Sequence, residues 1–551
     1  MIDLRNASRR ALLVGASGAV LTSACTSFFS SANDTGDNEL RRETLRAMKR
    51  AARFMRERVA YRGGYVWSYA SDFSRRWGEM EAFPTMIWIQ PPGTATVGHL
   101  YLDCFHATRD EFYYQAAMEV ADGLTAAQHP SGGWNYLHDF AGEDSTRRWY
   151  DTIGKNGWRL EEFHHYYGNA TFDDAGTSEA SQFLLRMYLE RRSSRLRAPL
   201  ERAVRFVLDS QYESGGWPQR FPFVEDAPAL HGHPDYTRYV TFNDDVAGEN
   251  IKFLLMVYQT LGDERALAAI HRAMEVFIAT QQPAPQAGWG LQHHNETLAP
   301  IGARSYEPDA LTTHTTANNL AQMMNFYEWT GDRRFIERVP EALAWLDSVR
   351  LRDDQVQVAG RHYPTFIEVG SNRARINHRR GSNVVNGEYY WDYNVAKPIT
   401  HYSQWRSLNV EALRTNYTLL TQATHIRTRS PFERRADFSL PRYFTTQNIE
   451  VSDLNSNVGS GAVQRPSSQR VQELISSLNE EGYWPTPLTA TSNPYIGDGS
   501  PTPAPGDFAQ TLVGDVSDTS PHTTDRPETG ISTGAFIQNM SALLLSLDSG
   551  E

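Results

Sequence analysis

The chain of 551 residues has room for one to three domains and for a large hydrophobic core. Hydrophobic residues make up 40% and charged residues 21%, which is ordinary globular usage and excludes the disordered and fibrous classes. The formal net charge of −12 would repel a phosphate backbone, so we expect no nucleic-acid partner.

The N-terminus has the composition of an export signal. Three arginines precede the apolar run 11–21, and small residues lead from there to Cys25. The pattern is similar to a twin-arginine signal, and Cys25 resembles the lipid-bearing cysteine of a lipoprotein. We predict that residues 1–25 are the signal and residues 26–37 a polar tether, in a protein that is periplasmic, anchored to the outer membrane or secreted. The alternative is an apolar N-terminal helix packed on the body of the protein.

After removal of such a signal the chain would keep Cys104 as its cysteine, which excludes an intramolecular disulfide and a zinc site built from cysteines. No later stretch is long and apolar enough to span a bilayer. We expect a monomer without a transmembrane span. A lipid on Cys25 is the remaining way in which the protein could be anchored to a membrane.

A turn of glycine followed by an aromatic residue recurs along the chain. It occurs at residues 63–67, 132–135, 215–218, 288–290 and 482–485. In the first four turns, the glycine before the aromatic residue recurs after 69, 83 and 72 residues. Apolar stretches with a helical period precede the turns, at residues 44–59, 113–128, 198–211, 266–281 and 471–478. Trp217 and Trp289 in these turns are most simply core residues, with stacking on a sugar as the less favoured alternative.

A second helix follows several of these turns. The predicted second helices are residues 176–190, 247–261 and 316–330. Two helices in each repeated unit bury their apolar faces best when the units close into a ring. Strand-like alternation is scarce, so we predict an all-α fold, an incomplete (α/α) toroid or barrel of helical hairpins with glycine–aromatic turns.

The predicted toroid occupies residues 38–400 and forms the catalytic domain. Residues 400–466 show no pattern that places them, and residues 486–529 read as a long loop rich in Pro, Thr, Ser and Gly. A last helix is predicted at residues 533–547. Residues 401–551 are therefore expected to form a C-terminal extension with one further helical unit, packed on the toroid.

Acidic residues stand just before two of the second helices. Asp173 and Asp244 precede these helices in positions that the sequence makes equivalent, where each could cap its helix and interact with the helix dipole. With Asp174 and Asp245 they make four carboxylates near one rim of the ring, which is more negative charge than two caps require. Hard oxygen ligands of this kind suit Ca²⁺.

Arginines gather further along the chain. Arg304 lies in a turn-like segment, and residues 372–381 hold four arginines, among them Arg373 and Arg379. Such a run is usually a solvated face or an ion-pair network. The alternative is a clamp for uronate carboxylates, which a planar guanidinium contacts at two points. Tyr306 is a candidate proton donor, with a core or ion-pair role at least as favoured.

Five motifs in this order resemble family 10 of the pectate lyases. They are TFDD at 171–174, GGWPQ at 215–219, TFNDD at 241–245, ARSYEP at 303–308 and EVGSNR at 368–373. The likeness covers about residues 120–392. The fold that it implies is an (α/α) toroid, in agreement with the helical repeat.

The resemblance implies cleavage of a 4-linked polyuronate such as pectate by β-elimination, assisted by Ca²⁺. By position, Asp173, Asp244 and Asp245 would bind the metal, with Asp173 also engaging the substrate carboxylate. Arg379 falls where the family has the arginine that removes the C5 proton. Because arginine is effectively always protonated, such a base requires a strongly perturbed pKa or alkaline conditions.

The resemblance further implies that Arg304, Arg373 and Tyr306 contact the substrate. This sequence also departs from the family pattern. Thr365 stands where an arginine is expected, His294 stands where an acidic residue is expected, and an arginine pair is missing near residue 388. These departures leave the reaction class in place and weaken the expectation that polygalacturonate itself is the substrate.

Two other functions remain open on the sequence alone. An α/α-toroid glycoside hydrolase acting on uronic-acid oligosaccharides would use Asp173 and Asp244 as acid and base without calcium. A non-catalytic lipoprotein that binds pectin fragments would account for the missing arginines. Hydrolysis would create no carbon–carbon double bond, and binding would occur without turnover.

Overall fold

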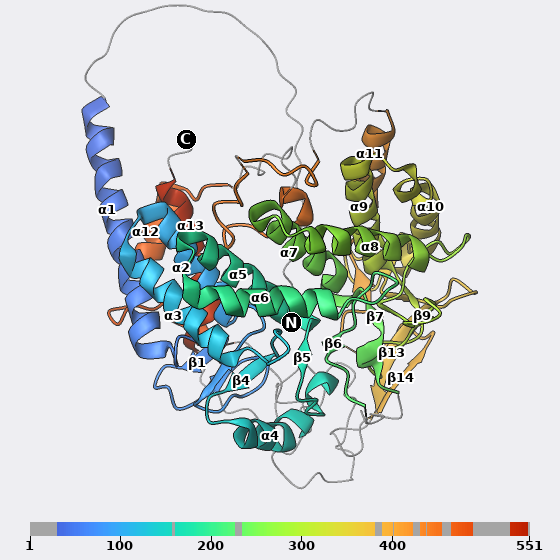
Figure 1. The fold of residues 1–551 in the computed structure, drawn as a ribbon, viewed down its shortest axis with the longest axis horizontal. Helices are drawn as coiled ribbons and strands as arrows, with labels where there is room; N and C mark the ends of the chain where they lie inside the picture. The colour runs from blue at the N-terminus through green and yellow to red at the C-terminus, as the bar shows by residue number, and fades with distance from the viewer. Residues whose placement is uncertain are drawn as a thin grey trace, which may run out of the picture.

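The computed structural model of the protein describes most of the chain. The described residues are 30–156, 160–225, 234–380, 388–399, 402–422, 430–436, 438–454, 464–488 and 529–548. Helical hairpins surround a common interior, and short strands gather at one end, at the bottom of Figure 1. We call this end the rim. The arrangement confirms the predicted (α/α) toroid of helical hairpins.

Most helices of the inner layer are buried on nearly every side, as expected of helices without a polar stripe, whereas residues 410–422 have one buried side chain, that of Val410. The helices of this layer are α2 (Thr94–Thr108), α5 (Gly176–Arg191), α7 (Val246–Leu261), α9 (Thr313–Thr330), α11 (Val410–Gln422) and α13 (Thr533–Leu547). Helix α2 packs against α13 on one side and α5 on the other, α5 packs against α7, and α9 packs against α11. These helices surround the interior of the toroid.

The outer helices are amphipathic. They are α1 (Ser30–Phe54), α3 (Glu111–Ala127), α6 (Ser194–Asp209), α8 (Glu264–Thr280), α10 (Val339–Val349) and α12 (Ser468–Ser477), and α4 (Glu143–Thr152) lies below them at the rim. In α6, the buried residues Leu196, Leu200 and Val207 recur with the helical period. Aspartates cap two of these helices, because the side chains of Asp110 and Asp263 accept hydrogen bonds from backbone N–H groups of the first turn.

Four of the glycine–aromatic turns share one hydrogen bond to the outer helix before them. The indole Nε1 of the turn tryptophan donates to a carbonyl of the preceding outer helix at 2.8 to 3.0 Å, in Trp134, Trp217, Trp289 and Trp484. Trp217 and Trp289 are fully buried, which confirms their role in the core. At Gly215, with φ of +96°, a Cβ would lie 2.0 Å from the carbonyl oxygen of Arg272, so glycine is required there.

Short antiparallel strands follow the turns. The strands are β1 (Ser68–Ala70), β2 (Arg76–Trp77), β3 (Met86–Trp88), β4 (Leu137–Asp139), β5 (Ala170–Thr171), β6 (Arg220–Phe221), β7 (Val240–Thr241), β8 (Gln292–His293), β9 (Pro300–Ile301), β10 (Leu311–Thr312), β11 (Tyr363–Pro364), β12 (Phe366–Ile367), β13 (Ala374–Arg380), β14 (Glu388–Asp392), β15 (Trp405–Arg406), β16 (Thr486–Pro487) and β17 (Thr529–Ser532). The sheets pair as β16-β17-β1-β2, β10-β12-β13-β14, β7-β8-β9, β3-β4, β5-β6 and β11-β15. The hairpin of β13 and β14 is an element that the sequence pattern did not predict.

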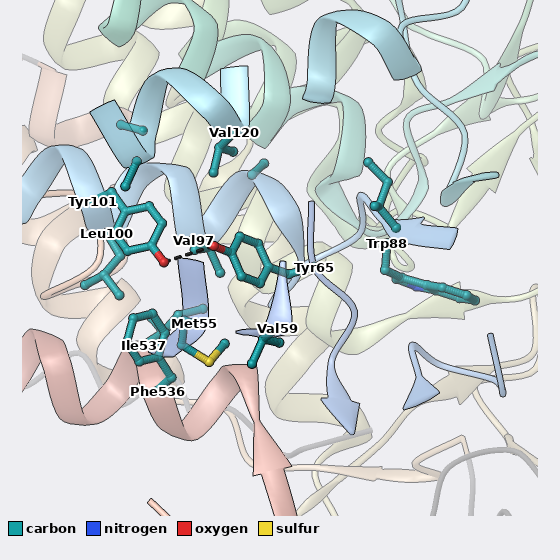
Figure 2. Close-up of a cluster of buried hydrophobic side chains, with 14 of the residues drawn as sticks. Met55, Val59, Tyr65, Trp88, Val97, Leu100, Tyr101, Val120, Phe536 and Ile537 are labelled. Carbon is teal, nitrogen blue, oxygen red and sulfur yellow. Dashed lines mark hydrogen bonds between the residues drawn. The ribbon is translucent and has the colours of Figure 1, made fainter. Parts of the chain in front are cut away.

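The two ends of the described chain share one hydrophobic core. Figure 2 shows Met55 at the end of the first outer helix beside Tyr101 of α2 and Ile537 of α13. The hydroxyl groups of Tyr65 and Tyr101 lie 3.0 Å apart within this core. The predicted last helix, residues 533–547, is confirmed as α13. None of the helices in the described ranges is long and apolar enough to cross a membrane.

Residues 430–436 and 438–454 contact the inner helices of the toroid. Arg186 of α5 donates to the carbonyl of Arg442 at 3.2 Å, and Lys252 of α7 donates to the carbonyl of Ile449 at 2.9 Å. This segment lies within the stretch that the sequence could not place, which also contains α11. The C-terminal extension thus contacts the inner helices directly.

The remaining predictions fall at or beyond the limits of the described residues. The predicted export signal, residues 1–25 with Cys25, lies outside them, and so does most of the predicted loop 486–529. Of the predicted tether, residues from Ser30 onward already belong to α1. The sequence pattern did not predict the helices α2, α4, α10 and α11 individually. The hairpin repeat implies only that each outer helix has a partner helix.

Candidate active site at the rim

The acidic residues expected at one rim are brought together by two similar turns. The 3₁₀ turns η4 (Asp173–Ala175) and η6 (Asn243–Asp245) lead into α5 and α7. In each turn two successive residues are left-handed: Asp174 (φ 51°) with Ala175, and Asp244 (φ 50°) with Asp245. The sequence prediction that Asp173 and Asp244 are equivalent is therefore wrong by one position, because the backbone makes Asp174 the counterpart of Asp244.

Asp173 forms the centre of a buried ion-pair cluster. Arg304 Nη2 donates to Asp173 Oδ2, and the hydroxyl of Tyr136 donates to the same oxygen at 2.5 Å. Arg304 also lies 3.3 Å from Glu162 and 3.1 Å from Glu307, atom to atom. The guanidinium that the resemblance assigned to the substrate is thus paired with carboxylates of the protein.

The cluster holds more acid than Arg304 can neutralise. Burial and the neighbouring Asp173 raise the pKa of Asp244 well above its usual value. Burial and the charges of Asp244 and Asp173 raise the pKa of Asp174 in the same direction. At Asp173 burial alone would raise the pKa, but the charge of Arg304 outweighs it and the pKa is lowered. The rim therefore favours a bound cation or proton.

A calcium ion fits the chemistry of this cluster in part. Carboxylate oxygens are the ligands that Ca²⁺ prefers. The buried Asp173 Oδ1 has no well-directed hydrogen bond from the described residues, although Asp244 and Gln219 lie close enough to affect its pKa. Within the described ranges, no three His, Cys, Asp or Glu side chains converge as a complete metal site. Asp173 and Asp244 would have to share the ion with substrate carboxylates or water.

Asp245 lies apart from this cluster. Its pKa is raised to about 8 by burial and by the charges of Glu249 and Glu450, and Lys252 lowers it. These neighbours belong to α7 and to residues 438–454. The metal prediction grouped Asp245 with Asp173 and Asp244. The structure does not bring Asp245 together with them.

Arg379 lies in β13, buried with 6% of its surface exposed. Alternation along the strand places it on the same face as Asn377, whose side-chain amide donates to the carbonyl of Tyr306 at 2.6 Å. Tyr389 lies opposite Arg379 on β14, and its ring contacts the ring of Tyr306 at a centroid distance of 5.3 Å. The structure thus brings Arg379 toward Tyr306, next to the Asp173 cluster.

Tyr306 is buried and contacts the acidic cluster. Its hydroxyl donates to Glu162 Oε2 at 3.2 Å. Burial raises the pKa of Tyr306 well above its usual value, so the phenol keeps its proton. Burial also raises the pKa of Glu162 to about 8, with Arg304 acting in the opposite direction. Tyr306 and Glu162 can therefore both hold a proton near neutral pH.

Arg373 is exposed, and its guanidinium stacks on Tyr393 at 3.3 Å from the ring centroid. Arg375, two residues further on in β13, stacks on Trp391 at 3.9 Å and lies 3.1 Å from Glu368. Arg373 therefore lies at the surface of the strand hairpin, outside the Asp173 cluster.

Three residues of the site were missed by sequence reasoning. Glu161 and Glu162 belong to a short turn, η3 (Glu161–Phe163), and Glu161 accepts a hydrogen bond from the backbone N–H of Ser305 at 2.9 Å. Arg220 lies beside the cluster at the start of β6. The adjacent acids Glu161-Glu162 and the arginine that follows the GGWPQ motif were the available signals.

The positions at which the sequence departs from the family pattern have local partners. Thr365 donates to the carbonyl of Ser403 at 2.5 Å and accepts a hydrogen bond from Arg406 Nε at 3.2 Å. Arg406, from the C-terminal extension, thus brings a guanidinium to the position where an arginine was expected. His294 accepts backbone hydrogen bonds within its own turn, from Glu296 at 3.2 Å among others.

Residues 143–399 match the family model of pectic acid lyases. No protein of curated function matches the sequence. Among solved structures, a family 10 polysaccharide lyase from Cellvibrio cellulosa has 16% identity and a TM-score of 0.39, over 58% of this chain and 94% of that one. A variant of a family 10 polysaccharide lyase from Cellvibrio cellulosa, in complex with trigalacturonic acid, has 16% identity and a TM-score of 0.38, over 60% of this chain and 98% of that one.

A more distant likeness is to a cellobiose 2-epimerase from Spirochaeta thermophila, with 12% identity and a TM-score of 0.33, over 63% of this chain and 94% of that one. At these TM-scores the structural likenesses support no functional conclusion. The family match is different, because its segment contains all five motifs that carried the resemblance. Residues 143–399, a little under half of the chain, are therefore similar to the pectic acid lyases.

Proposed function

We propose that the protein cleaves a 4-linked polyuronate by β-elimination, with Arg379 as the base and Ca²⁺ as the metal. The observation that carries this proposal is the juxtaposition of Arg379, Tyr306 and the Asp173 cluster within the segment that matches the pectic acid lyases. An exported protein, which the N-terminal pattern predicts, would meet such a polymer outside the cytoplasm.

The reaction removes the proton from C5 of a uronate unit. The electron pair of the C5–H bond forms the C4–C5 double bond, the C4–O bond breaks, and the leaving oxygen takes up a proton. Arg379 would accept the C5 proton, and Tyr306 would give a proton to the leaving oxygen. Since arginine holds its own proton at neutral pH, we expect the rate to rise toward alkaline pH.

The acidic cluster would act on the substrate carboxylate. When bound, Ca²⁺ would supply a positive charge that stabilises the carbanion developing next to that carboxylate. Asp173 and Asp244 would hold the ion from the protein side. Arg304 would keep Asp173 ionised and in place, because it lowers the pKa of this buried carboxyl.

The test is the ultraviolet absorbance of unsaturated product, measured with polygalacturonate and other uronans at neutral and alkaline pH. We expect Arg379→Ala to reduce turnover by about 10² to 10⁴-fold, the usual range for loss of a general base. The matched control is Arg380→Ala, because Arg380 is the next residue on β13, points to the other face and pairs with Glu388 at 2.6 Å at the surface. Turnover in this control should stay near that of the wild type.

The same assay tests the metal. Chelation should abolish the absorbance rise, and added Ca²⁺ should restore it. An active Arg379→Ala variant would remove the base assignment, and a rate that survives chelation would remove calcium. New reducing ends without absorbance would identify a hydrolase, and binding without either signal would identify a pectin-binding protein.

A further inference from the structure

Arg220 is a buried arginine without an acidic partner in the described part of the structure. Only 2% of its surface is exposed. Its Nη1 donates to the side-chain oxygens of Asn135 at 3.3 Å and Asn169 at 3.2 Å. The guanidinium lies 5.1 Å from the ring centroid of Tyr136 and 4.9 Å from that of Tyr167. Its Nη2 is buried without a hydrogen bond.

Two other buried arginines, Arg186 and Arg304, are paired with carboxylates. Arg186, 3% exposed, contacts Asp103 at 2.7 Å. Arg304 contacts Asp173 and two glutamates. A buried charge that lacks a counter-ion is costly, and native proteins seldom keep one without a function. A bound anion would therefore give Arg220 the counter-ion that the described residues do not supply.

The tyrosines around Arg220 cannot serve as that anion. Burial raises the pKa of Tyr167 to about 12 and also raises the pKa of Tyr136 well above its usual value, so both phenols stay neutral. Their rings hold the guanidinium by cation–π contacts, and the two asparagines hold its Nη1 edge. This leaves Nη2 without an acceptor among the described residues, and a carboxylate oxygen is the acceptor that a guanidinium binds most strongly.

The ring of Tyr136 lies between Arg220 and the Asp173 cluster. Tyr136, against which the guanidinium rests, donates its hydroxyl to Asp173 Oδ2 at 2.5 Å. Tyr236 also borders the cluster, with its ring centroid 5.8 Å from the guanidinium carbon of Arg304. Asn135, which accepts the hydrogen bond from Arg220, is half-buried, so the surroundings of Arg220 reach the protein surface.

We propose that Arg220, held by Asn135 and Asn169, binds the carboxylate of a uronate unit next to the unit that reacts at the Asp173 cluster. The proposal rests on the proposed function and adds a second point of acid recognition along the polymer. Binding of a carboxylate by Arg220 makes the enzyme select for unesterified uronates at two neighbouring units, because a methyl ester carries no charge to pair with the guanidinium.

The experiment measures calorimetric binding of trigalacturonate and of its methyl ester, with Ca²⁺ present, in the Arg379→Ala background so that cleavage does not compete. We expect Arg220→Met to weaken trigalacturonate binding at least tenfold, as for loss of a charged hydrogen bond, and to leave ester binding unchanged. Arg220→Lys keeps the charge and should restore part of the affinity. The matched control is Arg205→Met on α6, which removes an arginine that is 62% exposed.

Thermal unfolding separates this role from a structural one. If Arg220 is kept for a ligand, the free Arg220→Met protein should melt at or above the wild-type temperature, because an unpaired buried charge has been removed. A lower melting temperature with equal loss of both ligands would instead make Arg220 a structural residue. Unchanged trigalacturonate affinity in a folded variant would also overturn the proposal.

The two proposals fail in different ways. A wild-type protein that yields no unsaturated product but binds trigalacturonate through Arg220 would refute the lyase and keep the carboxylate site. A wild-type protein that cleaves uronans while Arg220→Met binds normally would refute the carboxylate site alone. Absence of both cleavage and uronate binding would refute both.

Discussion

Arg304 faces three carboxylates at once, those of Asp173, Glu162 and Glu307. A single guanidinium cannot balance three buried negative charges, so some of these groups keep a proton at neutral pH. Glu162 is the clearest of them, since burial raises its pKa to about 8. Burial also raises the pKa of Glu161, the preceding residue, to about 7.

These raised values predict that stability falls as the pH rises. Between about pH 4.5 and 8 the folded Glu162 holds a proton that the unfolded chain releases, so the free energy of unfolding declines by up to about 1.4 kcal/mol per pH unit. Glu162→Gln should flatten this slope in urea unfolding followed across pH 5 to 8. The control, Glu143→Gln, alters a glutamate that is 62% exposed and should keep the wild-type slope. A slope that persists in Glu162→Gln would assign the proton to another group.

The residues of the site were predictable only where their motif also fixed the backbone. Asp173, Arg304 and Tyr306 do converge, as the ordered motifs implied. Asp245 does not, because two successive left-handed residues turn its side chain toward α7. Arg373 lies at the surface because its position in the hairpin depends on strand register, which local sequence does not encode.

At the scale of the element, a buried threonine joins some of the inner helices to a turn. Thr177 of α5 accepts a hydrogen bond from the backbone N–H of Trp134 at 2.9 Å, and Thr316 of α9 does the same for Trp289 at 3.0 Å. The hydroxyl replaces a strand partner for a backbone group that is fully buried. It thereby fixes the start of the inner helix, and with it the acidic turn just before that helix.

Replacement of this hydroxyl should destabilise the fold. Thr177→Val keeps the shape of the side chain but leaves the N–H of Trp134 buried without a partner, at a cost of about 1–3 kcal/mol. The control, Thr418→Val on the exposed surface of α11, should change the free energy of unfolding by less than about 0.5 kcal/mol. Urea unfolding of the two variants measures the difference. Equal stabilities would show that water or another group satisfies the Trp134 N–H.

Elements of the toroid were more predictable than its site, because the apolar period and the glycine turns both recur in the sequence. The bounds of α5, α7 and α13 agree with the predicted helices to within a few residues. Helix α11 was not predicted, since its buried face is small and it packs on α9 through a mixed surface. Residues 430–436 and 438–454 have no periodicity of their own, so only their tertiary contacts place them.

At the scale of the whole molecule, the C-terminal helices complete the side of the toroid where the described chain begins. Helix α13 packs against both α1 and α2, and α12 packs against α1. Arg50 of α1 donates to the carbonyls of Leu478 and Asn479 at 3.1 Å after α12. The extension thus shares the core of the first hairpin, and the toroid and the extension should unfold as one cooperative unit.

Leu544→Ala tests this cooperativity. Leu544 of α13 is fully buried, so the variant should lose about 2–5 kcal/mol of unfolding free energy. Because the core is shared, circular dichroism and uronan-cleaving activity should lose their signals at the same, lower urea concentration. The control is Leu419→Ala on α11, where the side chain is 62% exposed and its loss should leave the midpoint nearly unchanged. If activity outlasts the first loss of helix in Leu544→Ala, the extension unfolds independently and the rim does not depend on it.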